Sequence, residues 1–194
     1  MKTVKTIAFC GLDGSGKSTQ LKLVKNNLLK DKRILIAKLP YSPLNDLGKN
    51  PLKDLILEGR SGVEIIKYYL RLQGRESSKY DYILHDRHML CFLAYAHAYG
   101  IKNIETIKSL LNIIKNPDLT LYFDIPPEIA VKRIIERGEP INKHENIETL
   151  SKVREGYHRG IKLFPNVEII EAKRPIEQTT EHIKKILIKN DIIK

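Results

Sequence analysis

The sequence contains no tryptophan, only two cysteines and no apolar run long enough to span a membrane. Cys10 and Cys91 lie far apart, without the paired spacing of a disulfide framework or a metal-binding knuckle, so we expect two reduced, packed thiols. The opening residues MKTVKTIAFCGLDG run from a short strand pattern directly into glycines, without the apolar core of a signal peptide. These absences predict a cytoplasmic protein that has no contact with membranes.

Internal repeats, low-complexity segments and flexible linkers are also missing, so the sequence gives no sign of a domain boundary. The 194 residues suit one hydrophobic core, and the 42% hydrophobic and 29% charged residues are typical of a folded globular chain. We therefore expect a single domain that spans residues 1–194.

Acidic residues are fewer than basic ones, with 23 Asp and Glu against 34 Lys and Arg, which gives a net charge of +11. Such a charge attracts polyanions, and by itself it leaves both nucleotides and nucleic acid open. The basic residues are scattered as solvated surface charge is, and they form no basic tail or helix. No helix-turn-helix pattern or aromatic RNA-binding signature accompanies them, so nucleotides rather than nucleic acid are the expected partners.

Short apolar runs rich in Ile, Val, Phe and Tyr alternate with longer segments of helical period, which predicts an α/β fold with a parallel sheet and crossover helices. The five predicted strands are 4–9, 34–39, 82–85, 119–123 and 167–170. The predicted helices are 17–29, 62–79, 88–99, 104–115, 127–136, 145–164 and 177–189.

The stretch CGLDGSGKST follows the first predicted strand and holds three glycines, one lysine and two hydroxyl groups. Gly11, Gly16, Lys17 and Ser18 have the spacing of a phosphate-binding loop, a motif that lies between a strand and a helix. Its glycines let backbone N–H groups converge on a phosphate, the lysine reaches the outer phosphates, and the serine hydroxyl binds Mg²⁺. The alternative is a turn that merely joins strand to helix, and the flanking strand and helix favour the phosphate site.

Asp86, Arg87 and His88 follow the third predicted strand. Ligands of an open parallel sheet bind beyond the carboxyl ends of its strands, so we expect these residues beside the glycine-rich loop. A carboxylate there accepts a proton or holds Mg²⁺ through water, and an arginine neutralises charge on a transferring phosphoryl group. The alternative is a helix cap at Asp86 with a surface ion pair to Arg87.

Together these motifs make the sequence similar to the thymidylate kinase family of nucleoside monophosphate kinases. The segments GLDGSGKST, DRH followed by Ala94 and Tyr95, LYFDIPPEIAVKRIIERGE, VREGY and EAKRPIE occur in the family's order over nearly the whole chain. The resemblance implies a three-layer P-loop NTPase fold with a five-stranded parallel sheet, a short lid at about 136–148 and a homodimer. It also implies transfer of the γ-phosphate of ATP, with Mg²⁺, to a deoxynucleoside monophosphate, with dTMP favoured.

The resemblance assigns roles to individual positions. The implied catalytic residues are Lys17, Asp86, Arg87 and Arg137. The positions implied to bind ATP are Gly11, Leu12, Asp13, Gly14, Ser15, Gly16, Lys17, Ser18, Thr19, Arg133, Ala172, Lys173 and Arg174. The positions implied to bind the acceptor are Asp13, Pro40, Tyr68, Arg71, Arg87 and Tyr95. The residues implied to hold Mg²⁺ are Ser18 and Asp86.

Several of these roles have a specific chemical content. Arg71 is implied to grip the acceptor phosphate, and Arg133 to lie on the adenine opposite a wall formed by residues 172–175. Tyr95 is implied to pack beneath the acceptor sugar, where a 2′-hydroxyl would crowd its ring. Asp86 is implied to orient or deprotonate the acceptor and to help place the metal.

Most departures from the family pattern concern the acceptor base. Lys67 stands where the family usually has a phenylalanine that stacks on thymine, and Tyr68 lies next to it. Cys91 and Phe92 replace small polar residues that meet the base, and Ala96 replaces a residue that is often glutamine. We therefore predict a deoxynucleoside monophosphate kinase whose base preference is altered or relaxed.

The source of the catalytic cation is a second question. Members of the family carry a catalytic arginine either in the phosphate loop or in the lid, and Gly14 occupies the loop position. The lid therefore has to supply it, and Arg137 is the arginine it offers. Asn142, Lys143 and His144 stand where further arginine is expected, and lysine lacks the planar fork of a guanidinium.

Two rival functions belong to other classes of protein. One is a deoxynucleoside kinase of similar fold, against which the implied role of Arg71 argues. The other is a nucleotide-dependent nucleic-acid-binding module, for which the chain lacks a basic stripe. Among the remaining polar residues, His85 is expected to pack in the sheet, away from any zinc site. Asp124 is expected either to join the metal's outer shell or to cap the helix at 127–136.

Overall fold

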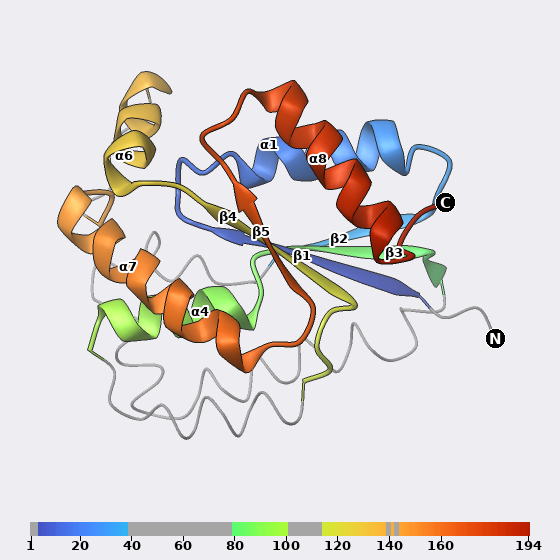
Figure 1. The fold of residues 1–194 in the computed structure, drawn as a ribbon, viewed down its shortest axis with the longest axis horizontal. Coiled ribbons are helices and arrows are strands. Elements are labelled where there is room, and N and C mark those ends of the chain that lie inside the picture. The colour runs from blue at the N-terminus through green and yellow to red at the C-terminus, as the bar shows by residue number, and fades with distance from the viewer. Residues whose placement is uncertain (1–3, 39–78, 101–113, 139–140, 142–143) are drawn as a thin grey trace.

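A computed structural model describes residues 4–38, 79–100, 114–138, 141 and 144–194 (Figure 1). Several predictions lie wholly or largely outside these residues and are not tested by the fold. They are the helices at 62–79 and 104–115, the acceptor positions Pro40, Tyr68 and Arg71, and positions 139–140 and 142–143 of the lid.

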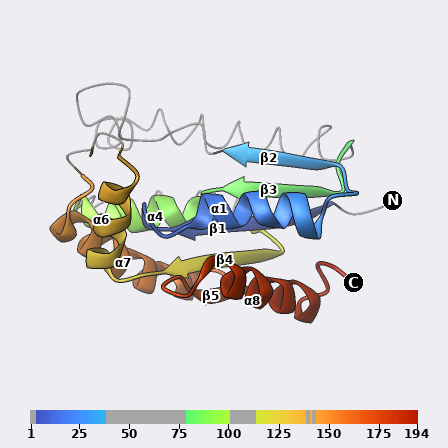
Figure 2. The ribbon, with the colours of Figure 1, turned by 90° about the horizontal axis from the view of Figure 1, so that it is seen from above.

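Five strands form one parallel sheet in the order β2-β3-β1-β4-β5, which Figure 2 shows side by side. They are β1 (Lys5–Gly11), β2 (Ile34–Lys38), β3 (Tyr82–Asp86), β4 (Leu119–Asp124) and β5 (Val167–Glu171). All five predicted strands are confirmed, with ends that differ by at most two residues. Strands covered on both faces read as continuous apolar runs, and β1, β3 and β4 are such strands.

The strand order places the site. From β1 the chain passes to β2, returns through β3, then crosses β1 to reach β4 and β5. Such a reversal of strand order opens a crevice at the carboxyl ends of the central strands, where open α/β sheets bind ligands. In this register Phe9 lies beside Asp86, and Gly11 lies beside Phe123. The loop after β1 therefore begins next to the end of β3.

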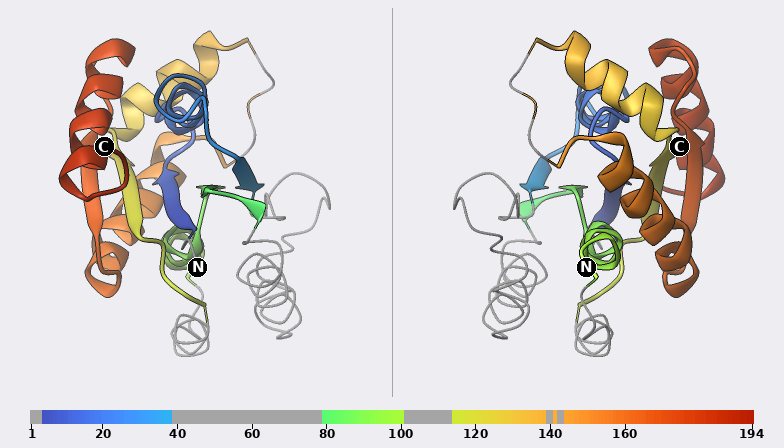
Figure 3. Two further views of the ribbon diagram at one scale, coloured as in Figure 1. Left: turned by 90° about the vertical axis from the view of Figure 1, so that its right-hand side faces the viewer. Right: turned by 90° about the vertical axis from the view of Figure 1, so that its left-hand side faces the viewer.

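Helices cover both faces of the sheet, which confirms the predicted three layers (Figures 1 and 3). One face carries α1 (Lys17–Leu23) and α8 (Ile176–Lys189), and the other carries α4 (Met89–Ala98) and α7 (Ile147–Gly160). A further helix, α6 (Pro127–Glu136), lies at the carboxyl ends of the strands and has the predicted bounds. No helix among the described residues has the length and apolar character needed to cross a membrane.

Two predicted helices change form before they end. The helix predicted at 17–29 is α-helical only to Leu23 and continues as a π-helical turn, η1 (Val24–Leu28). The helix predicted at 145–164 starts as α7 and ends in a 3₁₀ turn, η3 (Ile161–Leu163). The π-helical segment has five residues and the 3₁₀ segment three, which is about one turn each and too short for the hydrophobic pattern to show a change of period.

Helices α4 and α7 pack backbone against backbone. Every residue of α4 from Met89 to Ala96 is buried, because α4 lies between the sheet and α7. At Gly156 of α7, a Cβ atom would lie 2.5 Å from the carbonyl oxygen of Ala94. The absence of a side chain at Gly156 therefore sets the distance between the two helices.

The substitution Gly156→Ala tests this packing. It is expected to lower the free energy of unfolding by about 1–3 kcal/mol, because the added methyl group overpacks the α4–α7 contact. Chemical unfolding followed by circular dichroism measures the loss. Gly160→Ala on the same helix is the matched control, since its Cβ would meet the flexible end of Leu90 at 3.0 Å and the Cβ of Leu93 at an ordinary 3.8 Å, and no backbone atom. Equal stability of the two variants would contradict the close approach.

Candidate active site

The glycine-rich loop joins β1 to α1 with a backbone that requires glycine at two positions. Gly14 has φ 78°, and Gly16, the N-cap of α1, has φ 82°. At Gly14 a Cβ would also lie 2.4 Å from the carbonyl oxygen of Ala130 on α6, so the loop rests directly on that helix. The result is the strand–loop–helix arrangement in which backbone N–H groups and a helix N-terminus face a bound anion.

Lys17 begins α1 and is only 5% exposed. Its Nζ donates to the carbonyl oxygen of Leu12 at 3.1 Å and to a carboxylate oxygen of Asp13 at 3.3 Å. Burial lowers the pKa of Lys17, and the nearby Arg87 guanidinium lowers it further. The loop itself thus holds the ammonium group, through oxygens that phosphate oxygens can replace.

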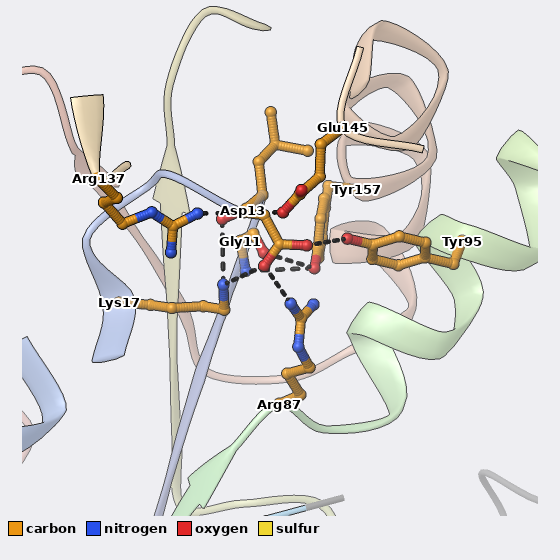
Figure 4. A network of polar contacts seen from close by, with 9 residues as sticks. Gly11, Asp13, Lys17, Arg87, Tyr95, Arg137, Glu145 and Tyr157 are labelled. Atoms are coloured by element: carbon orange, nitrogen blue, oxygen red, sulfur yellow. Dashed lines mark hydrogen bonds and ion pairs between the residues drawn. The ribbon is translucent and has the colours of Figure 1, made fainter. Parts of the chain in front are cut away.

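Asp13 is the centre of the polar network in Figure 4. One of its carboxylate oxygens accepts hydrogen bonds from Lys17 and from Nη2 of Arg87, and the other accepts from the hydroxyl of Tyr95 at 3.2 Å. Burial opposes ionisation of Asp13, but Arg87 and Lys17 outweigh that effect and hold the pKa of its carboxyl far below the ordinary value. Asp13 is therefore an anion that balances two cations.

Arg87 reaches this network because the chain turns sharply after β3. The residue adopts a left-handed backbone with φ 72°, and its guanidinium carbon lies 5.7 Å from the centre of the Tyr95 ring. Although burial alone lowers its pKa, Asp13 raises the pKa of Arg87 well above the ordinary value. The alternative of a helix cap with a surface ion pair is wrong, since Arg87 pairs with Asp13 and His88 is the N-cap of α4.

A cleft of about 520 Å³ opens beside the loop. The predicted ATP positions that line it are Asp13, Gly14, Ser15, Gly16, Lys17, Ser18, Thr19, Arg133, Ala172, Lys173 and Arg174. Gly11 and Leu12 do not line it, because they are buried behind the loop. Nη1 of Arg133 donates to the carbonyl oxygen of Ala172 at 2.9 Å, so the walls formed by α6 and by the segment before α8 are joined.

Gln20 also lines the cleft, and the sequence analysis missed it. Its side-chain amide donates to the carbonyl oxygen of Ile176 at 2.9 Å, and its Oε1 accepts from the hydroxyl of Thr180 at 2.9 Å. These bonds hold α1 against the start of α8 and so fix the spacing of two cleft walls. A glutamine on the apolar face of α1, beside Leu21, is the signal that could have revealed it.

Arg137 follows α6 and lines the same cleft. Its Nη2 lies 4.0 Å from Oε1 of Glu145, at the other end of the expected lid, and Arg137 is about half exposed. Glu145 was not among the predicted site residues. The ion pair brings the two ends of the segment 137–145 together at the cleft.

Cys91 stands at a position where the family has small polar residues that meet the base. Its side chain is 2% exposed and lies against Cys10 and Tyr157 behind the loop. Both thiols are free, as expected, but they are neighbours in the fold. Asp124 does not cap α6, whose N-cap is Pro126.

Asp124 instead anchors α7. It accepts two hydrogen bonds from Arg154, at 2.7 and 2.8 Å, and one from the hydroxyl of Tyr122 at 3.0 Å. Burial raises the pKa of this carboxyl, but the bonds from Arg154 and Tyr122 dominate and lower it to about 2. The carboxylate is thus committed to Arg154.

The histidines near the loop pack in the core. His85 and His88 are 5% and 1% exposed, and their rings meet edge to face with centroids 5.1 Å apart. The predicted packing of His85 in the sheet is therefore confirmed. Among the described residues, no group of three or more His, Cys, Asp or Glu side chains is arranged to hold a metal ion.

Comparison with known proteins gives one consistent result. The family model described as thymidylate kinase matches residues 66–183. A probable thymidylate kinase of Sulfolobus acidocaldarius is 31% identical, over 90% of this chain and 92% of its own length. A thymidylate kinase of Legionella pneumophila strain Corby is also 31% identical, over 95% and 94% of the two chains, and one of Thermosipho africanus is 29% identical, over 95% and 98%.

Acid is expected to destabilise the fold through His85. Burial lowers the pKa of His85 from 6.5 to about 4, so between these values the unfolded chain binds a proton that the folded chain does not. Stability therefore falls as the pH drops through this window, by at most about 3 kcal/mol from this residue. Urea unfolding at a series of pH values measures the loss.

The variant His85→Gln isolates this contribution, because glutamine stays neutral throughout. It should lose less stability than the parent between pH 6.5 and about pH 4.5. His182→Gln, on α8, is the control and should follow the parent. An identical acid loss in His85→Gln and the parent would remove His85 as a cause.

Proposed function

The chain belongs to the thymidylate kinase family, and from this premise we propose that it transfers the γ-phosphate of ATP to the phosphate of dTMP. It is an ATP-dependent nucleoside monophosphate kinase. The observation that carries the proposal is the convergence of Lys17, Arg87 and Tyr95 on Asp13 beside a cleft of nucleotide size. Both substrates are anions, and phosphoryl transfer depends on positioning them and neutralising their charge.

ATP occupies the cleft beside the loop. Its adenine lies between Arg133 and the segment 172–175, whose walls are already joined by a hydrogen bond. The loop N–H groups hold its phosphates, and Lys17 exchanges the Leu12 carbonyl for the outer phosphate oxygens. When Lys17 moves to the phosphates, the Asp13 carboxylate keeps its hydrogen bonds from Arg87 and Tyr95.

The acceptor lies on the other side of Asp13. Arg87 contacts the phosphates, and Asp86, at the end of β3, orients or deprotonates the acceptor phosphate. The ring of Tyr95 lies beneath the sugar and its hydroxyl is fixed by Asp13, which favours a deoxyribose. Arg71, Tyr68 and Pro40 complete this pocket on the strength of the resemblance, since they lie outside the described residues.

The loop also suits Mg²⁺. Magnesium in kinases takes a hydroxyl, one or two carboxylates, water and phosphate oxygens, so it needs no cluster of protein carboxylates. Ser18 is exposed and lines the cleft. Although burial lowers the pKa of the neighbouring Lys17, the negative charge of Asp86 acts in the opposite direction, so Asp86 lies close enough to act on the same loop. We assign Mg²⁺ to Ser18 and Asp86, where it would neutralise phosphate charge.

The chain forms a single domain with a lid at about 136–148. Arg137 supplies the catalytic cation from this lid. Gly14 carries no charge, and the contact of its backbone with Ala130 leaves no room for a side chain. Arg137 lines the donor cleft and is paired only loosely with Glu145. It is therefore free to swing onto the transferring phosphoryl group.

Arg137→Ala is expected to lower kcat by about 100-fold, as removal of one group that stabilises transition-state charge does. Its effect on ATP affinity should stay within about threefold, because Lys17 and the loop remain. Steady-state kinetics and calorimetry measure the two quantities. Arg159→Ala, at an exposed arginine of α7, is the control. An unchanged kcat in Arg137→Ala would exclude the arginine from the mechanism.

The acceptor panel tests the function itself. ADP release from ATP is followed with dTMP, dUMP, dCMP, dGMP and dAMP, with the nucleosides and with DNA as separate additions. The side chains of Phe92 and Ala96 offer no hydrogen bond to a base. dUMP lacks only the methyl group of dTMP, a difference that an apolar pocket distinguishes by only about 10- to 200-fold. We expect dTMP to be phosphorylated, and at least one other monophosphate to be phosphorylated with a kcat/KM that is lower by no more than this factor.

Other results of the panel have distinct meanings. Strict selectivity for dTMP would show that the substitutions do not relax base choice. Phosphorylation of nucleosides would indicate a deoxynucleoside kinase, and stimulation by DNA alone would indicate a nucleic-acid-binding module. A cytoplasmic homodimer belongs to the same proposal and rests on the resemblance; size-exclusion chromatography with light scattering tests the dimer.

A further inference from the structure

We propose that Tyr157 is a positioning residue that holds the first residue of the phosphate loop in its ATP-binding geometry. This inference rests on the proposed ATP site. Tyr157 lies on α7, 146 positions from the loop, and is fully buried. Its hydroxyl reaches Gly11 (Figure 4), and neither residue lines the cleft.

The hydroxyl binds both backbone groups of Gly11. The Gly11 N–H donates to the Tyr157 oxygen at 3.2 Å, and the hydroxyl donates to the Gly11 carbonyl oxygen at 3.1 Å. One side-chain atom therefore satisfies a donor and an acceptor of the same residue. This is the pattern of bonds that a neighbouring strand would otherwise provide.

Gly11 needs such a partner because β3 ends too early to supply one. In an extended strand, alternate residues direct their backbone groups to the same side. The Phe9 carbonyl accepts from the Arg87 N–H at 3.1 Å, on the β3 side, so Gly11 also presents its groups there. The chain has by then turned at Arg87 toward α4, and the Tyr157 hydroxyl takes the place of the next strand residue.

Tyr157 is itself held rigidly. Its ring stacks on Tyr122 with centroids 4.9 Å apart, and Asp124 fixes the preceding turn of α7 through Arg154. The contact of Gly156 with Ala94 sets the distance between α7, which carries Tyr157, and α4. Burial also raises the pKa of Tyr157 well above its ordinary value, so the hydroxyl keeps the proton that it donates.

The groups that meet ATP come directly after Gly11. The carbonyl of Leu12 and the carboxylate of Asp13 both hold Lys17, so a tilt at Gly11 would displace all three. A loop that samples other arrangements binds ATP in proportion to its competent fraction. Tyr157 therefore acts on ATP affinity through the loop, without contact with the nucleotide.

Tyr157→Phe tests this role, because it removes only the hydroxyl and keeps the ring stacked on Tyr122. We expect the Kd for ATP to rise about tenfold, with kcat at saturating ATP and the KM for dTMP each within about twofold. Amide hydrogen exchange at residues 11–18, without nucleotide, should become faster. Tyr122→Phe is the matched control: it removes a hydroxyl from the same ring stack, bound to Asp124 instead of the loop, and should leave both readouts near the parent.

The outcomes separate this inference from the proposed function. Tyr157→Phe with the ATP affinity and amide exchange of the parent would overturn the role of Tyr157 while leaving the kinase intact. A parent that binds no ATP would overturn the proposed function, whereas amide exchange would still decide the role of the hydroxyl. If Tyr157→Phe does not fold, 4-aminophenylalanine at position 157 is the second variant, because its amino group keeps a hydrogen-bond donor there. We expect this variant to bind ATP about threefold more weakly than the parent. An ATP affinity and an amide exchange rate equal to those of the parent would overturn the inference.

Discussion

The carboxylate of Asp13 makes the site possible, because it allows two buried cations to share one small volume. Lys17 and Arg87 come from different elements, and each has lost most of its water. Without an anion between them they would repel each other at a high desolvation cost. The Asp13 carboxylate supplies this anion through its hydrogen bonds from Lys17 and Arg87. The ends of β1 and β3 are adjacent in the sheet, and that is what brings the three side chains together.

The loop that carries Asp13 contacts two helices. The backbone of Gly14 lies directly against α6, which also carries Arg133. From behind, α7 reaches the base of the loop through Tyr157, and the contact at Gly156 keeps α7 close to α4. Helices α6 and α7 thus both support the loop, although α7 does not line the cleft. A parallel sheet alone would leave the loop attached only at its two ends.

The fold and the geometry of the glycine-rich loop could be predicted from the sequence because their signals are local. The apolar runs determined the strands, Pro127 marked the first turn of α6, and the spacing of glycines and lysine marked the loop. The direction of Cys91 could not be predicted, since packing of α4 between the sheet and α7 sets its rotation. Tyr157 and Gln20 were missed for a related reason. Each acts through a partner more than 140 residues away, which no local pattern records.

The approach of Gly14 to α6 also limits how this sequence can change over time. An arginine at position 14 would move a cation from lid to loop, but the left-handed backbone and the Ala130 carbonyl exclude it unless α6 moves first. A displaced α6 would carry Arg133 away from Ala172 and open the adenine wall. An evolving lineage would therefore have to cross an intermediate with a damaged nucleotide site. A substitution at position 14 alone is therefore not sufficient to place an arginine in the loop.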